Sequence, residues 1–314
     1  MARSPLLALA LAMGAGLLSA CDGEFVNLGT SDAPLGEAGR PGGPPLIRVW
    51  QVAEAPLLPQ MEGLLLASPS LTASGELFFS AQERGTSGGE PKPTGVWHAP
   101  PVAGGFGAPT ALQLGTMTSA DVASPAVSPS GRELWFGMNP TGRDTDVFRC
   151  ELLDGVCGTP VEVEELNGDY DDAPRPPALG ETMMALSSKR HGRPTLYQIY
   201  LVTRASAEAA WSAPSQAGLE TINSAEFQSA DGFLAEEGLA LYFSSTRAGT
   251  SDLYVARRSS LATSFGAPQA LADLNSSAEE RMPWLSPDGQ KLYFVSDRAS
   301  GRYAQYSLYV AQKL

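Results

Sequence analysis

A segment of about fifty residues occurs five times in this chain, and this repeat limits the folds that the chain can adopt. Each copy contains a glycine in a predicted turn, and a short apolar strand follows it. The five turns read LTASGELFF, VSPSGRELWF, PALGETMMA, LAEEGLALYF and LSPDGQKLYF, with Gly75, Gly131, Gly180, Gly238 and Gly289. Six positions earlier stand Pro69, Pro125, Pro174, Gly232 and Pro283. Such a period is typical of structural units that stack or close into a ring.

Each copy offers about four short strands. A second apolar stretch follows the turn, as in DLYVA and SLYVA, and four copies continue with FGAPTAL, CGTPVEV, WSAPSQA or FGAPQAL. A four-stranded sheet cannot cover both of its faces alone, whereas a closed ring of such sheets leaves only short edges exposed. The sequence therefore predicts an all-β fold, a β-propeller with five four-stranded blades. Six blades are the alternative, but they require more chain than the N-terminal segment provides.

The fifth copy ends at Leu314, directly after its third predicted strand. The segment RVWQVAEAPLLPQ, residues 48–60, contains Ala55 and Pro56, which match Ala267 and Pro268 of the fourth copy. We therefore expect this N-terminal segment to supply the missing outer strand of the last blade and to close the ring.

The N-terminal region has the features of an export signal. Residues 1–20 carry one basic residue and an apolar run that is short for a membrane span, as in a signal peptide. The run ends in Leu18-Ser19-Ala20-Cys21, which resembles the lipobox of bacterial lipoproteins, in which the cysteine is lipidated. A plain signal peptide that happens to contain a cysteine is the alternative. Residues 21–45 are rich in Gly and Pro and are expected to form a flexible tether, with the propeller at 46–314.

Two of the repeats resemble a known family. SPDGQKLYFVSDR and GLALYFSSTRAGTSDLYV, the latter at 238–255, are similar to the repeat of TolB-type, WD40-like propellers of the bacterial envelope. The resemblance covers residues 65–314 and is weakest in the third copy. It implies a propeller that is exported and faces the periplasm or the cell surface. It implies no particular ligand, and the choice between inner and outer membrane stays open.

Charge and motif content exclude several classes of function. The formal net charge is −13, so we expect no nucleic-acid partner and no binding to anionic lipid headgroups; the lipid anchor is the expected membrane contact. The chain has only two histidines, His98 and His191, too few for a His-rich metal site. No nucleophile elbow, Walker loop or dinucleotide motif is present. We therefore expect no catalytic residues and no cofactor.

Cys150 and Cys157 stand in equivalent positions of neighbouring predicted strands. Cys150 aligns with Ala99, Val202, Ala256 and Ala311, and Cys157 aligns with Phe106, Trp211 and Phe265. In an exported protein this placement predicts a disulfide. Two free buried thiols are the alternative, and the cysteines are too few for a structural zinc site.

Carboxylates gather just ahead of the predicted inner strands. They are Asp121, Asp171, Asp172, Glu226, Glu279 and Glu280, and three of the segments share an Asn in LNGDYDD, INSAEF and LNSSAEE. Propeller geometry is expected to bring them near one mouth of the central channel as an acidic rim. One interpretation is that Asn167, Asn223 and Asn275 cap turns while the acids face water or pair with nearby arginines. The other is a site for calcium or for a basic partner surface.

Three functions follow from these observations. The leading hypothesis is a lipid-anchored, non-catalytic scaffold of the cell envelope that binds an envelope protein or a cell-wall component. The alternative is a carbohydrate-active propeller enzyme, a glycoside hydrolase or lyase, that uses channel-mouth carboxylates. First strands such as SPAV and MPWL carry no carboxylate, which disfavours the enzyme. The third is a structural protein without a specific ligand. A closed ring has no need to associate, so a monomer is expected.

Overall fold

The computed structural model describes most of the chain after the predicted tether. The described residues are 49–53, 57–83, 95–115, 122–140, 142–153, 155–192, 195–299 and 306–314. The predicted signal peptide, Cys21 and the tether lie outside them and stay predictions. Within the described residues, no helix has the length and apolar character needed to span a membrane.

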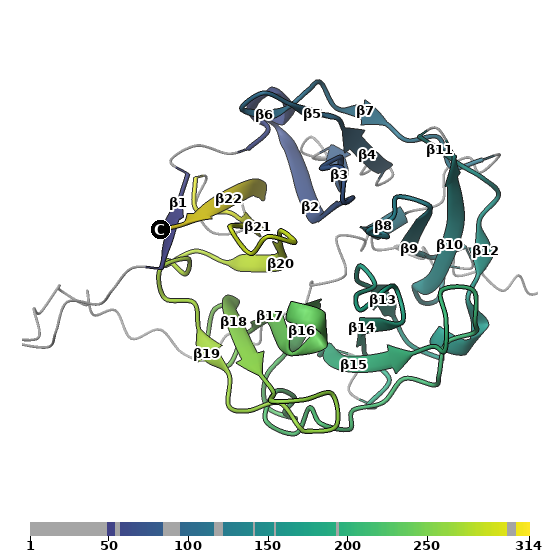
Figure 1. Cartoon of the computed structure of the whole chain (residues 1–314), viewed down its shortest axis with the longest axis vertical. Coiled ribbons are helices and arrows are strands. Elements are labelled where there is room, and N and C mark those ends of the chain that lie inside the picture. The colour runs from purple at the N-terminus through teal and green to yellow at the C-terminus, as the bar shows by residue number, and fades with distance from the viewer. Residues whose placement is uncertain are drawn as a thin grey trace, which may run out of the picture.

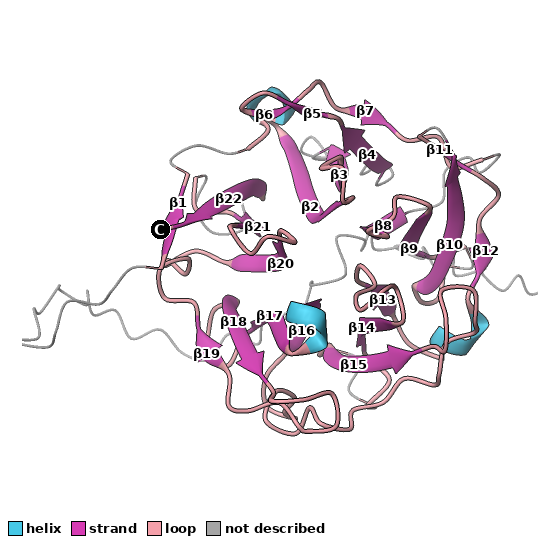
Figure 2. Ribbon diagram, viewed as in Figure 1, coloured by secondary structure: helices cyan, strands magenta, loops and turns pink. Residues whose placement is uncertain are grey.

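Five small antiparallel sheets lie around a central axis, as in a five-bladed propeller (Figures 1 and 2). The innermost strands are β2 (Leu64–Leu71), β8 (Val122–Val127), β13 (Asp172–Pro174), β16 (Ser229–Ala235) and β20 (Glu280–Leu285). The second strands are β3 (Leu77–Glu83), β9 (Glu133–Met138), β14 (Met183–Ser188), β17 (Ala240–Ser245) and β21 (Lys291–Ser296). The prediction of an all-β propeller with five blades is confirmed.

The outer half of each blade is less regular. The third strands are β4 (Gly95–Ala99), β10 (Asp146–Leu153), β15 (Gln198–Thr203), β18 (Asp252–Arg257) and β22 (Ser307–Lys313). The outer strands are β7 (Thr110–Ala111), β12 (Val161–Glu162), β19 (Gln269–Ala270) and β1 (Trp50–Val52). Short additions are β5 (Pro101–Val102), β6 (Gly105–Phe106), β11 (Val156–Cys157) and the 3-10 turns η1 (Pro59–Met61), η2 (Glu164–Leu166) and η3 (Glu236–Gly238).

The repeated turn joins the first and second strands of a blade. In the fifth blade the amide of Gly289 donates to the carbonyl of Ser286 at 2.8 Å, and the Ser286 hydroxyl accepts from the amide of Lys291 at 2.9 Å. Gly289 has a φ of +67°, a conformation that glycine adopts without steric cost. The turn therefore requires the glycine that marks each repeat.

Four of the innermost strands contain a β-bulge, which explains why a proline is tolerated at the repeated position in most of them. Ser68, Ser124, Asp231 and Met282 have positive φ values between 52° and 59°, and the pairing register shifts there. Each directly precedes the repeated Pro or Gly. A bulge releases an amide from the ladder, so proline is tolerated inside the strand. The third blade differs, because Pro174 pairs in register with Leu186 and lies at the end of β13.

The N-terminal strand closes the ring as predicted. β1 pairs antiparallel with β22, with Gln51 opposite Gln312. Figure 1 shows β1 as the outermost strand of the last blade, beside the C-terminus. The Asp273 carboxylate accepts hydrogen bonds from the amides of Val49 and Trp50 at 2.6 and 3.2 Å. Ala55 and Pro56, which suggested this pairing, lie outside the described residues.

The third blade lacks a regular fourth strand among the described residues. Its WSAPSQA segment makes one bridge, in which Leu201 and Ser215 exchange backbone hydrogen bonds at 2.8 and 2.9 Å. Trp211 is 5% exposed and packs edge-on against Trp135 of blade 2, with ring centroids 5.7 Å apart. The segment thus fills the space between two blades.

The predicted disulfide joins Cys150 on β10 to Cys157 on β11. Both side chains are buried, and the carbonyl of Cys157 accepts from the amide of Gly115 at 3.1 Å. The bridge therefore holds a hairpin of blade 2 against the connection from blade 1.

Removing this disulfide is expected to destabilise the protein by about 2.5 kcal/mol, because the bridge closes a loop of eight residues in the unfolded chain. The measurement is denaturant unfolding of a Cys150→Ala/Cys157→Ala variant against the oxidised protein. Reduction of the native protein is expected to give the same loss. An intact mass that does not rise by two hydrogens on reduction would contradict the bridge itself.

Candidate functional site

Two of the predicted rim acids are buried in ion pairs. Asp172 and Glu280 are the first residues of β13 and β20, and both side chains are 0% exposed. Asp172 lies 2.6 Å from Arg190, and Glu280 lies 3.0 Å from Arg298. Each arginine follows the second strand of the same blade. Both carboxylates are thus held within their own blades and are withdrawn from solvent.

The arginines also connect each blade to the segment that precedes it. The guanidinium of Arg190 donates to the carbonyl of Leu166 at 2.5 Å, and that of Arg298 donates to the carbonyl of Leu274 at 2.6 Å. In blade 4, Arg247 donates in the same way to Ile222, at 2.8 Å. The three arginines form a repeated contact at the start of blades 3, 4 and 5.

The three repeated asparagines bind a neighbouring strand instead of capping a turn. Asn167, Asn223 and Asn275 use the side-chain oxygen to accept from one backbone amide and the side-chain nitrogen to donate to the carbonyl of the same residue. The residues bound are Val147, Ile199 and Leu253, each on the third strand of the preceding blade. The expectation that these asparagines cap turns is corrected, because the amide extends the preceding sheet.

The remaining described rim acids have partners of their own. Asp171 pairs with Lys189 at 2.8 Å, and Glu279 lies 2.5 Å from Arg281 and accepts from the hydroxyl of Tyr306 at 2.8 Å. Glu226 is exposed, and Asp121 lies outside the described residues. Over the described ranges, no three His, Cys, Asp or Glu side chains form a cluster that could hold a metal ion. Binding of calcium or of a basic partner by these acids therefore stays a prediction.

One carboxylate was missed by the sequence interpretation. The first strands were expected to be free of carboxylates, but β16 contains Asp231, which is 3% exposed, and β13 and β20 begin with acids. Asp231 accepts from the hydroxyl of Ser244 at 2.6 Å. Asp231 precedes Gly232 as Ser124 precedes Pro125 and Met282 precedes Pro283, so the repeat spacing already placed this acid in the first strand.

Burial raises the pKa of two further carboxyls at the blade junctions. Asp146 and Asp252 begin the third strands of blades 2 and 4, and the pKa of each is raised to about 6 from 3.8. Burial is the main cause, and neighbouring carboxylates add to it, led by Asp144 for Asp146 and Glu280 for Asp252. The folded protein therefore binds protons more tightly at these sites than the unfolded chain does.

Asp146→Asn is expected to raise the melting temperature near neutral pH. Because the folded pKa is the higher one, stability of the native protein falls as pH rises from about 4 to about 6, and the amide avoids this loss. The gain is expected to be full above about pH 6 and to vanish below about pH 4. Thermal unfolding of both proteins across this range is the measurement. A gain of equal size at low pH would contradict the titration of Asp146.

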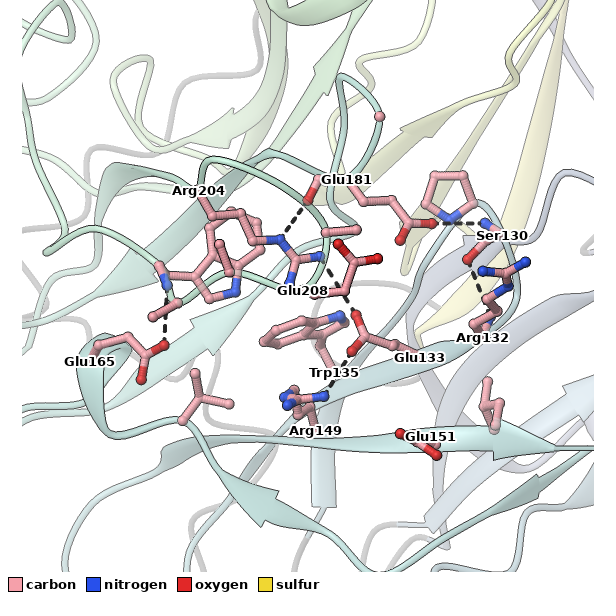
Figure 3. A pocket seen from close by; sticks show the side chains of 18 of the residues that line it. Ser130, Arg132, Glu133, Trp135, Arg149, Glu151, Glu165, Glu181, Arg204 and Glu208 are labelled. Atoms are coloured by element: carbon pink, nitrogen blue, oxygen red, sulfur yellow. Dashed lines mark hydrogen bonds and ion pairs between the residues drawn. The ribbon is translucent and has the colours of Figure 1, made fainter.

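A cavity of about 980 Å³ lies elsewhere, between blades 2 and 3. Figure 3 shows Glu133 and Trp135 on β9 and Arg149 on β10 at one side of it, and Arg204 at the other. The loop from Ala207 to Trp211 completes the wall on the blade 3 side. We call this space the interblade cleft. Its volume is at the upper end for small-molecule sites.

Charged groups and indoles are interleaved on the floor of the interblade cleft. Glu133 lies 2.8 Å from Arg149 and 3.6 Å from Arg204 (Figure 3). The Arg204 guanidinium lies 4.3 Å from the ring centroid of Trp211 and 5.5 Å from that of Trp135. Such cation–π contacts place donors and flat apolar surface side by side.

Four buried polar atoms of the interblade cleft have no hydrogen-bond partner. They are Glu133 Oε2, Arg204 Nη2, Trp135 Nε1 and Trp211 Nε1. A buried polar atom without a partner costs about 1–3 kcal/mol, so these four atoms are candidates for contact with a water molecule or a ligand. The sequence interpretation did not identify this site, since Trp211 was assigned to an outer strand and the others lie on β9 and directly after β15.

A second cavity of about 510 Å³ opens on the same side of the propeller. Phe233, Tyr242 and Trp284 line it, and Pro129 borders both cavities. Turns between first and second strands border both cavities. Residues 129–130 and 180–181 line the interblade cleft, and residues 235–237 and 286–289 line the second cavity. One face of the propeller therefore carries two adjoining cavities.

Comparison with known proteins gives a likeness of fold. No family model and no curated protein matches the chain. A protein of unknown function from Dyadobacter fermentans is 8% identical, over 81% of this chain and 96% of its own, with a TM-score of 0.51. A protein from Agrobacterium tumefaciens described as a TolB is 16% identical over 76% of this chain and 72% of its own, with a TM-score of 0.49. TolB from Acinetobacter baumannii is 14% identical over 79% of this chain and 54% of its own, with a TM-score of 0.49. The chain is a five-bladed β-propeller by its own sheets, and its likeness to these structures concerns the fold alone.

Proposed function

We propose that this chain is a lipid-anchored, non-catalytic binding protein of the bacterial cell envelope, and that the interblade cleft is its ligand site. The observation that carries the proposal is the set of four unpartnered buried polar atoms among the residues that line the cleft. A closed ring of rigid sheets holds such groups in place before a ligand arrives, which lowers the entropy cost of binding.

The proposed location rests on the N-terminal sequence. Leu18-Ser19-Ala20-Cys21 matches a lipobox, and acyl chains on Cys21 would attach the protein to a membrane at roughly 0.8 kcal/mol per buried methylene. Residues 21–45 would then separate the propeller from the bilayer.

The carboxylates of the propeller support binding rather than hydrolysis. Hydrolysis of a glycosidic bond requires one carboxylic acid and one free carboxylate on opposite sides of the bond. Asp172 and Glu280 are fully buried in ion pairs, and Asp231 is bound to Ser244. In the interblade cleft, Glu133 is held between two arginines. Each of these four carboxylates is thus engaged by at least one fixed partner.

Attachment is tested by fractionation of cells that express the full chain or a Cys21→Ser variant. The native protein is expected in the membrane pellet and in the detergent extract of that pellet, and the variant in the soluble fraction. Equal distribution of the two proteins would overturn the lipid anchor and leave the binding proposal intact.

Binding is tested by co-sedimentation of the purified full chain with isolated cell envelopes. Ala209→Trp, in a loop that lines the interblade cleft, is expected to reduce the bound fraction at least tenfold, because the indole fills the cavity. The control is Ala262→Trp, at an exposed turn outside the cleft. Release of sugars from envelope polysaccharide by the native protein would favour the enzyme, and equal binding by both variants would exclude the cleft.

A further inference from the structure

We propose that the interblade cleft binds an uncharged saccharide. This inference deepens the proposed binding function and rests on it. The argument uses the chemistry of the four unpartnered atoms, the charges around them and the apolar surface beside them.

The open hydrogen-bonding positions require a ligand that both donates and accepts. Arg204 Nη2 and the two indole nitrogens are donors, whereas Glu133 Oε2 is an acceptor. Glu133 and Arg204 face each other at 3.6 Å, which is too long for a direct hydrogen bond. A single hydroxyl oxygen can accept from the guanidinium and donate to the carboxylate. Hydroxyl groups are therefore the simplest complement to the floor of the cleft.

The charges of the cleft disfavour ionic ligands. Five glutamates and three arginines line it, so an anion meets an excess of carboxylates. An ammonium group has three donors and no acceptor, so it cannot satisfy the three open donors of Arg204, Trp135 and Trp211. A neutral ligand avoids both conflicts.

Apolar surface lies next to these polar atoms. Trp135, Trp211, Leu152 and Val163 line the cleft. A sugar ring presents C–H groups on its faces and hydroxyl groups at its edge, and this combination matches a floor on which indoles alternate with Arg and Glu side chains. Arg149, whose side chain is 40% exposed, lies 5.9 Å from the Trp135 ring and can move as a ligand enters.

The test is isothermal titration of the full chain in detergent with four probes. They are a neutral oligomer of N-acetylglucosamine, a cationic glucosamine oligomer, an anionic galacturonate oligomer and an uncharged tripeptide amide with acetylated N-terminus. The neutral oligomer is expected to bind at least tenfold more tightly than the other three. Tighter binding of a charged oligomer or of the peptide would overturn the assignment to uncharged sugars.

Two variants test the individual hydrogen bonds. Trp211→Phe keeps the aromatic ring and removes the Nε1 donor, and it is expected to weaken binding of the neutral oligomer about three- to tenfold. Glu133→Gln is expected to weaken it by about tenfold or more, because hydrogen bonds to charged groups are stronger. The control is Trp97→Phe on β4 of blade 1, outside the cleft. Thermal unfolding of each variant separates loss of folding from loss of binding.

The outcomes distinguish this inference from the proposed function. If envelope co-sedimentation depends on Ala209 but the neutral oligomer does not bind, the class of ligand is wrong and the binding function stands. If neither assay shows binding at the cleft, both proposals fail. Equal affinities of Trp211→Phe, Glu133→Gln and the native protein would show that the sugar binds elsewhere.

Discussion

Replacing Arg298 with methionine is expected to destabilise the propeller by about 3–5 kcal/mol, because the change leaves the carboxylate of Glu280 buried without its cation. Glu280 is 0% exposed, and Arg298 also donates to the carbonyl of Leu274 at 2.6 Å. Methionine retains most of the length and apolar volume of the arginine stem, so the loss reports mainly on charge and hydrogen bonds. Urea unfolding near neutral pH gives the free energies to compare.

The chain contains its own control for this prediction. Arg247 occupies the same place in blade 4, but there its neighbour is the hydroxyl of Ser229, at 3.4 Å, instead of a carboxylate. Arg247→Met is therefore expected to cost only about 1–2 kcal/mol, from lost hydrogen bonds and lost contacts with aromatic rings. Adding Glu280→Gln to Arg298→Met is expected to recover part of the loss. Equal costs for the two arginines would contradict a role for the buried charge.

Trp50→Ala is expected to destabilise the protein by about 3–5 kcal/mol, because it removes a large buried side chain from the strand that closes the ring. Trp50 is 7% exposed and belongs to the main core cluster together with Trp284 and Tyr293. The measurement is urea unfolding, monitored by circular dichroism. The transition is also expected to broaden if blade 5 opens before the other blades.

Val49→Ala is the matched control for the closing strand. Val49 is 44% exposed and contributes its backbone amide and carbonyl, which alanine retains. Its replacement is expected to change stability by less than about 0.5 kcal/mol. If Trp50→Ala had an equally small effect, β1 would not stabilise the ring through its side chain.

The repeat alone predicted most of the architecture. The spacing of the turn glycines predicted the number of blades. The absence of a fourth strand segment in the fifth repeat predicted that the N-terminal strand, β1, pairs with β22. The positions of Cys150 and Cys157 in neighbouring predicted strands of one repeat predicted their disulfide. These features depend on local hydrogen bonds and on strand order, which recur with the repeat and can therefore be recognised in a single sequence.

The candidate site could not be predicted in the same way. Glu133 comes from blade 2, whereas Arg204 and Trp211 come from blade 3. Arg258 and Phe265 make the equivalent pair in blade 4, so the repeat pattern does not single out the pair in blade 3. The acids that did attract attention are dispersed among separate ion pairs at the blade junctions. Sequence spacing places residues along a strand but does not say which of them face a neighbouring sheet across the same gap.

The sequence by itself determined that this chain forms a closed ring of five β-sheets, because short periodic strands can bury both faces only against copies of themselves. Only the tertiary structure decided which charged side chains form ion pairs and which buried polar atoms have no hydrogen-bond partner. The reason is that the partner of a buried side chain depends on the rotation and separation of adjacent blades. At the interblade cleft, Glu133 Oε2 and Arg204 Nη2 lie 3.6 Å apart without a hydrogen-bond partner, and both residues line a cavity of about 980 Å³.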